Sequence, residues 1–116
     1  FNSVYINLDG DVFDFYSGVK DFHENLLRFI FNPIDQIQQD YLRAIRYIRF
    51  LSLFKNTKTQ KKDIDAILLL SKNIFYFVKE KKISQELTKI KDMPYPLNSV
   101  HFLENHRELR DFLQFF

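Results

Sequence analysis

PIDQIQQDYLRAIRYIRFLSLF, residues 33–54, is the stretch that decides the fold. Its apolar residues recur at the spacing that places side chains on one face of an α-helix. Pro33 suits the start of a helix, because a first-turn N–H has no partner within the helix. We therefore predict one long amphipathic helix from Pro33 to about Phe54. Asp40, Arg43 and Tyr47 are expected on the opposite or flanking surface. The predicted buried stripe consists of Ile34, Ile37, Tyr41, Ile45, Ile48 and Ser52.

Before this stretch the pattern is that of extended chain. Val4, Ile6 and Leu8 share one side of an alternating run, and residues 12–15 resume the extended pattern. The step between the two runs is Asp9-Gly10, and glycine accepts the positive φ of a tight turn. The sequence therefore predicts a β-hairpin, followed by a short helix over residues 19–25 and a short strand over residues 26–30.

After the stretch the chain remains helical in pattern. Residues 55–62 have loop composition, residues 64–78 and 83–90 have helical spacing, and the Met93-Pro94-Tyr95-Pro96 segment ends the second of these helices. One or two closing helices are predicted between Leu97 and Phe116. The aromatic run at residues 75–77 is interpreted as core. The fold class is therefore α+β: a short N-terminal hairpin followed by an all-helical region.

Composition excludes several classes of site. The chain has no cysteine, so disulfides and thiolate metal sites are excluded. Hydrophobic residues make up 46% of the sequence, which favours a folded core over disorder. No apolar run is long enough to span a bilayer, so we expect no membrane partner. The lack of cysteine fits a reducing cytosol, and the expected location is cytoplasmic.

The net charge of +2 is small, but the lysines are grouped. Such groups can contact nucleic-acid phosphates. A solvated loop and a solvated helix end are the alternative interpretation. His101 and His106 are five residues apart, a spacing that does not favour a shared metal ion, so no metal site is predicted. The candidate RNA phosphate contacts are Lys55, Lys58, Lys61 and Lys62.

Asp40 and Arg43 lie three residues apart, so on a helix they are neighbours. Such a pair taken alone is usually a surface ion pair of small energetic effect. Other short motifs accompany this one in a fixed order. They are the Asp9-Gly10 hairpin, Asp14 with Gly18, Arg28-Phe29-Ile30, Asn32-Pro33, Asp40-x-x-Arg43-x-x-Arg46 with Arg49-Phe50, and KISQELTKI at residues 82–90.

In this order and spacing the chain resembles the class II tRNA nucleotidyltransferases, which include the CCA-adding enzymes and the bacterial poly(A) polymerases. The resemblance implies that Asp40 and Arg43 act as a protein template for the base of CTP or ATP. It implies that Arg46 holds the nucleotide or positions Arg43. It also implies RNA, the tRNA 3′ end, as a partner. Gln36 and Gln39 depart from the family, which usually has Arg and Glu there.

The resemblance also implies a division of the chain. Residues 1–32 correspond to the end of the family's head domain, residues 33–92 to its helical neck, and residues 93–116 to the start of its helical body. The family's phosphate-holding turn and Asp-x-Asp pair would precede Phe1, and no segment here replaces them. We therefore expect an interior fragment with no catalytic residue and no cofactor of its own. Mg²⁺ with CTP or ATP is implied for the intact enzyme.

Such a fragment is expected to be inactive alone and to need the missing head domain, or a separate chain that supplies it. Two alternatives remain open: a non-catalytic helical module that binds RNA or another partner, and a decayed gene fragment. The motifs do not separate CCA addition from poly(A) addition, because both groups of enzymes share them.

Overall fold

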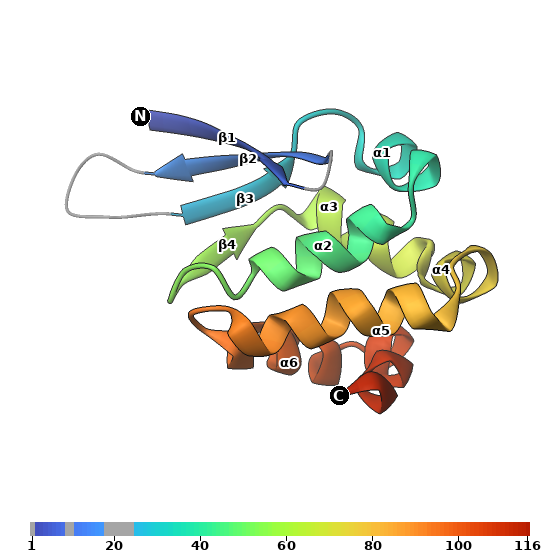
Figure 1. Ribbon diagram of the computed structural model, residues 1–116. Coiled ribbons are helices and arrows are strands. Elements are labelled where there is room, and N and C mark those ends of the chain that lie inside the picture. Colours follow the sequence, from blue (N-terminus) through green and yellow to red (C-terminus); the bar gives the residue numbers. More distant parts are fainter. Residues whose placement is uncertain (1, 9–10, 18–24) are drawn as a thin grey trace.

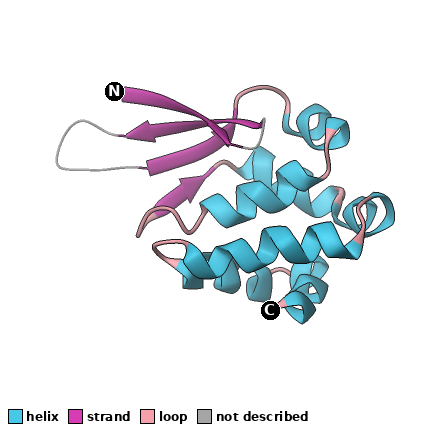
Figure 2. Cartoon of the chain, viewed as in Figure 1, coloured by secondary structure: helices cyan, strands magenta, loops and turns pink. Residues whose placement is uncertain are grey.

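The computed structural model describes residues 2–8, 11–17 and 25–116, and the side chains of residues 25–116. A sheet lies at one side of the molecule and the helices fill the other (Figure 1, Figure 2). The strands are β1 (Asn2–Leu8), β2 (Asp11–Ser17), β3 (Asn25–Phe29) and β4 (Thr57–Thr59), in the order β1-β2-β3-β4. This arrangement of strands and helices confirms the predicted α+β class.

The predicted hairpin is present, because β1 and β2 pair antiparallel with Leu8 opposite Asp11. Strand β3 confirms the short strand expected over residues 26–30, and it pairs antiparallel with β2. The Asp9-Gly10 turn and residues 18–24 lie outside the described residues. The prediction of a loop over residues 55–62 is wrong in part. Thr57–Thr59 forms strand β4, which pairs parallel with β3; threonine, a β-branched residue, favours such a strand.

The single helix predicted from Pro33 to Phe54 is divided into α1 (Pro33–Gln39) and α2 (Leu42–Phe50). The side chain of Asn32 accepts hydrogen bonds from the N–H groups of Ile34 and Asp35 and so caps α1. Asp40 then adopts an extended conformation, φ −157° and ψ 107°, which ends α1. The division follows from this residue, because its side chain offers a backbone N–H an alternative partner to continued helix.

The predicted buried stripe is largely confirmed. Ile37, Ile45, Ile48 and Ser52 are buried, and the other two members are half-buried. Tyr47 was expected at the surface, but it is completely buried. Its ring stacks on Phe29 of β3, with the ring centroids 4.9 Å apart. The sheet therefore packs on the face of α2 that carries Tyr47, which we had expected to be exposed.

Of the later helices, one is divided and one is confirmed. The helix expected over residues 64–78 divides at Leu70 into α3 (Lys61–Leu69) and α4 (Ser71–Phe77). The helix expected over residues 83–90 is confirmed as α5 (Glu80–Thr88), which a short 3₁₀ turn extends. Pro96 begins α6 (Pro96–Asn105), and a final 3₁₀ segment, η2, covers Arg107–Phe115.

Helix α2 lies at the centre, between β3 on one side and α5 and α6 on the other (Figure 1). The core includes Leu27 and Phe29 of the sheet together with apolar residues of every helix from α1 to α6, and Leu109 and Phe112 of η2. The aromatic run at residues 75–77 is core only in part, since Tyr76 is 83% exposed. None of the helices that the structure describes is long and apolar enough to cross a membrane.

Candidate functional site: the junction of α1 and α2

Asp40 lies at the junction of α1 and α2, and its carboxylate contacts two residues of α2. Oδ1 accepts a hydrogen bond from the N–H of Leu42 at 3.0 Å and so caps the start of α2. Oδ2 lies 3.7 Å from Nη1 of Arg46, and the Asp40 side chain is 43% exposed. The carboxylate is thus oriented by the protein and still open to solvent.

Arg43 is positioned by α1. Its Nη1 donates to the backbone oxygen of Gln36 at 3.2 Å, to Oε1 of Gln36 at 2.7 Å and to Oε1 of Gln39 at 3.0 Å. Gln36 and Gln39 are two of the positions at which the chain departs from the family pattern, and both side chains contact Arg43 through an amide oxygen. A neutral amide oxygen therefore accepts from the guanidinium at the position where the family pattern has a carboxylate.

Arg46 is 9% exposed, and it belongs to a buried group of charges. Its Nε donates to Oε1 of Glu86 on α5 at 3.2 Å. Nη2 of Arg49 lies 3.6 Å from Oε2 of the same carboxylate, and Nζ of Lys89 lies 3.3 Å from Oε1. Sequence reasoning did not assign a role to Glu86. Its place in the KISQELTKI motif was the available signal.

A pocket of about 290 Å³ opens beside Asp40, between the start of α2 and the α4–α5 connection. The rings of Tyr41 and Phe77 stack in it, with centroids 5.1 Å apart and planes 9° apart. Asn73 donates to the Tyr41 hydroxyl at 3.2 Å, which holds that ring, and Phe77 is 61% exposed. The lining residues are Asp40, Tyr41, Leu42, Phe77, Val78, Lys79 and Lys82. A carboxylate, an aromatic surface and two ammonium groups therefore share one pocket.

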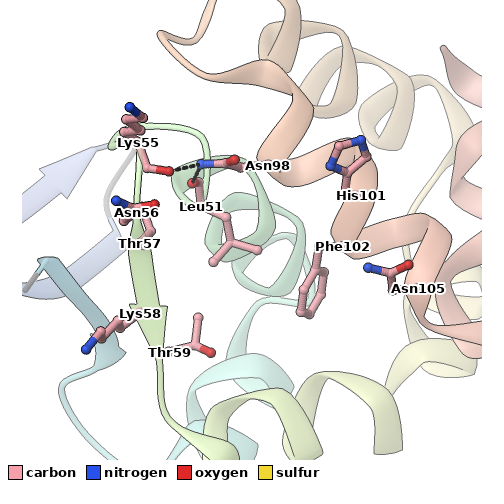
Figure 3. Close-up of a pocket in the computed structure, with 10 residues that line it drawn as sticks. All are labelled: Leu51, Lys55, Asn56, Thr57, Lys58, Thr59, Asn98, His101, Phe102 and Asn105. Atoms are coloured by element: carbon pink, nitrogen blue, oxygen red, sulfur yellow. Dashed lines mark hydrogen bonds between the residues drawn. The ribbon is translucent and has the colours of Figure 1, made fainter.

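The lysines proposed as phosphate contacts divide into two sets. Lys55 and Lys58 line a second pocket of about 390 Å³, beside α6 (Figure 3). Lys61 lies outside it, 2.7 Å from Oδ2 of Asp65 in an exposed ion pair. Lys62 is exposed and is not among the residues that line the pocket. Of the four lysines, only Lys55 and Lys58 therefore line the second pocket.

One buried ionisable group lies between the sheet and the helices. Asp63 of α3 accepts hydrogen bonds from the N–H of Phe29 at 3.2 Å and from the Tyr47 hydroxyl at 3.3 Å. That hydroxyl also lies 3.0 Å from the carbonyl oxygen of Leu27. Burial raises the pKa of the Asp63 carboxyl, and burial beside that carboxyl raises the pKa of Tyr47. Both groups fix β3 against the helices.

The described residues offer no site for Mg²⁺, because no three His, Asp or Glu side chains among them lie close enough to hold a metal ion. His106 is held by the backbone oxygen of Phe102, 2.8 Å from its Nδ1, and His101 is exposed.

Comparison with known proteins bears on the resemblance. No family model and no solved structure matches the chain. Over 49 residues, 42% of this chain, it is 41% identical to "CCA tRNA nucleotidyltransferase 1, mitochondrial" of Homo sapiens. Over 51 residues, 44% of this chain, it is 37% identical to the "CCA-adding enzyme" of Bacillus subtilis. The match covers only 11% and 13% of the length of these two enzymes. Over this part, the chain is related to the CCA-adding tRNA nucleotidyltransferases, as its motifs predicted.

Proposed function

We propose that the junction of α1 and α2 recognises the base of CTP or ATP, as part of a tRNA nucleotidyltransferase. The observation that carries the proposal is the position of Asp40. Its carboxylate is oriented by the N–H of Leu42, remains 43% exposed, and lines a pocket with a stacked aromatic pair and two lysines. Partial identity to the CCA-adding enzymes supports the same function.

The chemistry of the bases explains the choice of residues. Cytosine and adenine carry an exocyclic amine, whereas uracil and guanine carry a carbonyl oxygen at the corresponding position. A carboxylate accepts from the amine, and in this proposal Asp40 is the acceptor. A guanidinium donates to the ring acceptor beside that amine, which Arg43 would do with its planar fork. Asp40 and Arg43 together would favour CTP and ATP over UTP and GTP.

The neighbouring residues have supporting roles in the proposal. Gln36 and Gln39 hold the Arg43 guanidinium over α1 through Nη1. Arg46 is buried, so its role would be to position Asp40 and not to contact the nucleotide. The exposed ring of Phe77 offers a surface on which a base can stack. No metal-dependent step is assigned to these residues.

The proposal is tested by the binding of the four nucleoside triphosphates to the wild-type chain and to Arg43→Ala. Loss of a bidentate base contact costs about 1–3 kcal/mol, so CTP and ATP should bind roughly 5- to 150-fold more weakly. The matched control is Arg107→Ala, which removes an exposed arginine from η2. If both variants bind CTP and ATP like the wild type, Arg43 does not read the base.

A further inference from the structure

We propose that Gln36 positions Arg43 for base recognition, so that the choice between CTP and UTP depends on a side chain of α1. This role rests on the proposed function and extends it to a residue that acts through Arg43. Oε1 of Gln36 lies 2.7 Å from Nη1 of Arg43. The same Nη1 lies 3.0 Å from Oε1 of Gln39 and 3.2 Å from the backbone oxygen of Gln36, so the side chain of Gln36 makes the shortest of these three contacts.

The two proposed base-reading residues are attached across the break between the helices. Asp40 follows the last residue of α1, and its carboxylate accepts from the N–H of Leu42 and lies 3.7 Å from Arg46, both in α2. Arg43 belongs to the first turn of α2, but its Nη1 donates to Gln36 of α1, seven residues earlier. Recognition of a base by two groups at once requires that the groups be held in a fixed relative position. The bond from Arg43 to Gln36 therefore helps to set the geometry of the pair.

Gln36 is itself fixed in place. Its N–H donates to the carbonyl oxygen of Asn32 at 3.0 Å, at the start of α1. The next residue, Ile37, is completely buried and attaches α1 to the core. Gln36 is half-buried, whereas Gln39 is exposed. Because water competes less with a sheltered hydrogen bond, the contact with Gln36 should contribute more to the position of Arg43 than the contact with Gln39.

The residue type at position 36 decides whether this contact can form. The family pattern usually has an arginine there, and an arginine side chain has N–H donors but no acceptor. Such a side chain could not accept from Arg43, and two neighbouring guanidinium groups would repel each other. Glutamine supplies a neutral oxygen at the same position. The departure from the family pattern at Gln36 therefore creates the contact that positions Arg43.

Titration of the chain with CTP and with UTP measures the effect as a ratio of affinities. The two nucleotides carry the same triphosphate, so effects of charge on the phosphates cancel in the ratio. Gln36→Ala removes the acceptor and should lower the ratio of CTP to UTP affinity by about tenfold, near the lower limit for one hydrogen bond to a charged group. Gln38→Ala removes an exposed glutamine from the same helix; it is the matched control and should keep the wild-type ratio.

Two further substitutions at residue 36 separate positioning from packing. Gln36→Glu keeps an acceptor oxygen in the same place and should keep the ratio within about twofold of wild type. Gln36→Arg introduces a long side chain without an acceptor and should lower the ratio at least as far as Gln36→Ala. A similar fall in all three variants, or in none of them, would overturn the proposal.

A double substitution tests whether Gln36 acts through Arg43. If it does, Gln36→Ala should have no further effect on nucleotide binding in a chain that already carries Arg43→Ala. Equal effects of Gln36→Ala with and without Arg43 would overturn the proposal, because they would show a role that does not pass through the guanidinium. Urea denaturation of each variant verifies that the chain remains folded under the conditions of the titration.

The outcomes distinguish this role from the proposed function. If Arg43→Ala weakens the binding of CTP and Gln36→Ala leaves the ratio unchanged, Arg43 still reads the base, and only the role of Gln36 is withdrawn. If Arg43→Ala has no effect on the binding of CTP and ATP, or if the wild-type chain binds neither nucleotide, the proposed function fails and the role of Gln36 fails with it.

Discussion

Oε1 of Glu86 accepts a hydrogen bond from Nε of Arg46 at 3.2 Å, although 40 residues separate them in sequence. The contact joins α5 to α2, and both side chains are nearly inaccessible, at 6% and 11% exposure. Since Arg46 also lies 3.7 Å from the Asp40 carboxylate, Glu86 is connected to the proposed base-reading residue through a single side chain. The stability of the helices and the geometry of the site therefore depend on the same buried charges.

Glu86→Gln should destabilise the chain by about 2–4 kcal/mol. The substitution leaves two buried guanidinium groups without the carboxylate they share, and removal of one partner from a buried pair is costly. Urea denaturation measures the change. The comparison variant is Lys61→Gln, which breaks an exposed pair and should cost at most about 1 kcal/mol. Similar losses in the two variants would mean that the Glu86 contacts contribute little.

Tyr47→Phe should destabilise the chain by about 1–3 kcal/mol. It removes the buried hydroxyl that donates to the carbonyl of Leu27 at 3.0 Å and lies 3.3 Å from Oδ2 of Asp63. Tyr76→Phe removes a hydroxyl from a side chain that is 83% exposed and should change stability by no more than about 0.5 kcal/mol. Thermal or urea unfolding of both variants distinguishes the results; an equally small effect would show that Tyr47 acts only through its ring.

Asp63 should give stability a component that falls as pH rises. Its pKa is raised above the ordinary value of 3.8 by burial, so the folded chain binds more protons than the unfolded chain in the window above that value. Stability from this group is full below about pH 3.8 and is lost as pH rises through the folded pKa. The stability of Asp63→Asn relative to wild type should therefore increase across this window and then level off. Urea titrations from pH 4 to 8 measure it, with the exposed Asp65→Asn as control.

Much of this fold follows from local pattern. The extended patterns on either side of Asp9-Gly10 predicted β1 and β2, a short strand was also expected at β3, and helical spacing predicted where most of the helical segments lie. The division at Asp40 was missed because the apolar stripe continues across it, from Ile37 to Ile45. At the interruption, the N–H of Leu42 donates a capping hydrogen bond to the Asp40 side chain. The spacing of apolar residues does not predict such a hydrogen bond. A polar side chain that can cap a helix indicates a possible helix boundary, even where the spacing of apolar residues indicates a continuous helix.

The candidate site was predictable only in part, for a related reason. Asp40 and Arg43 are three residues apart in the sequence, so a short sequence motif can identify both of them. The same region also contains Phe77, Lys82 and Glu86, because α4 and α5 fold back against α2. The spacing of residues within one segment cannot predict a contact between segments that are distant in sequence. Tyr47 was expected at the surface because helical spacing places it in one row with Asp40 and Arg43, whereas Asp63 and Leu27 satisfy its hydroxyl inside the core.

Asp40→Asn separates a role in base recognition from a role in structure. The side-chain oxygen of asparagine can still accept from the N–H of Leu42, and Asn and Asp cap helices about equally well, so stability should change by less than about 1 kcal/mol. Arg46 keeps its bond to Glu86. Loss of nucleotide binding in this variant could therefore not be attributed to unfolding of the junction, as it could for Asp40→Ala.

The expected result is a loss of discrimination and not only of affinity. A carboxylate accepts from the exocyclic amine of CTP but offers nothing to the carbonyl of UTP, whereas a carboxamide can accept from the first and donate to the second. The ratio of CTP to UTP affinity should therefore fall by about tenfold or more in Asp40→Asn. Asp35→Asn, which changes an exposed carboxylate in the first turn of α1, is the control and should keep the wild-type ratio. Titration of each variant with the two nucleotides measures both ratios. An unchanged ratio in Asp40→Asn, with unfolding free energy close to wild type, would mean that Asp40 only caps α2, and the base-reading role would then be withdrawn from this residue.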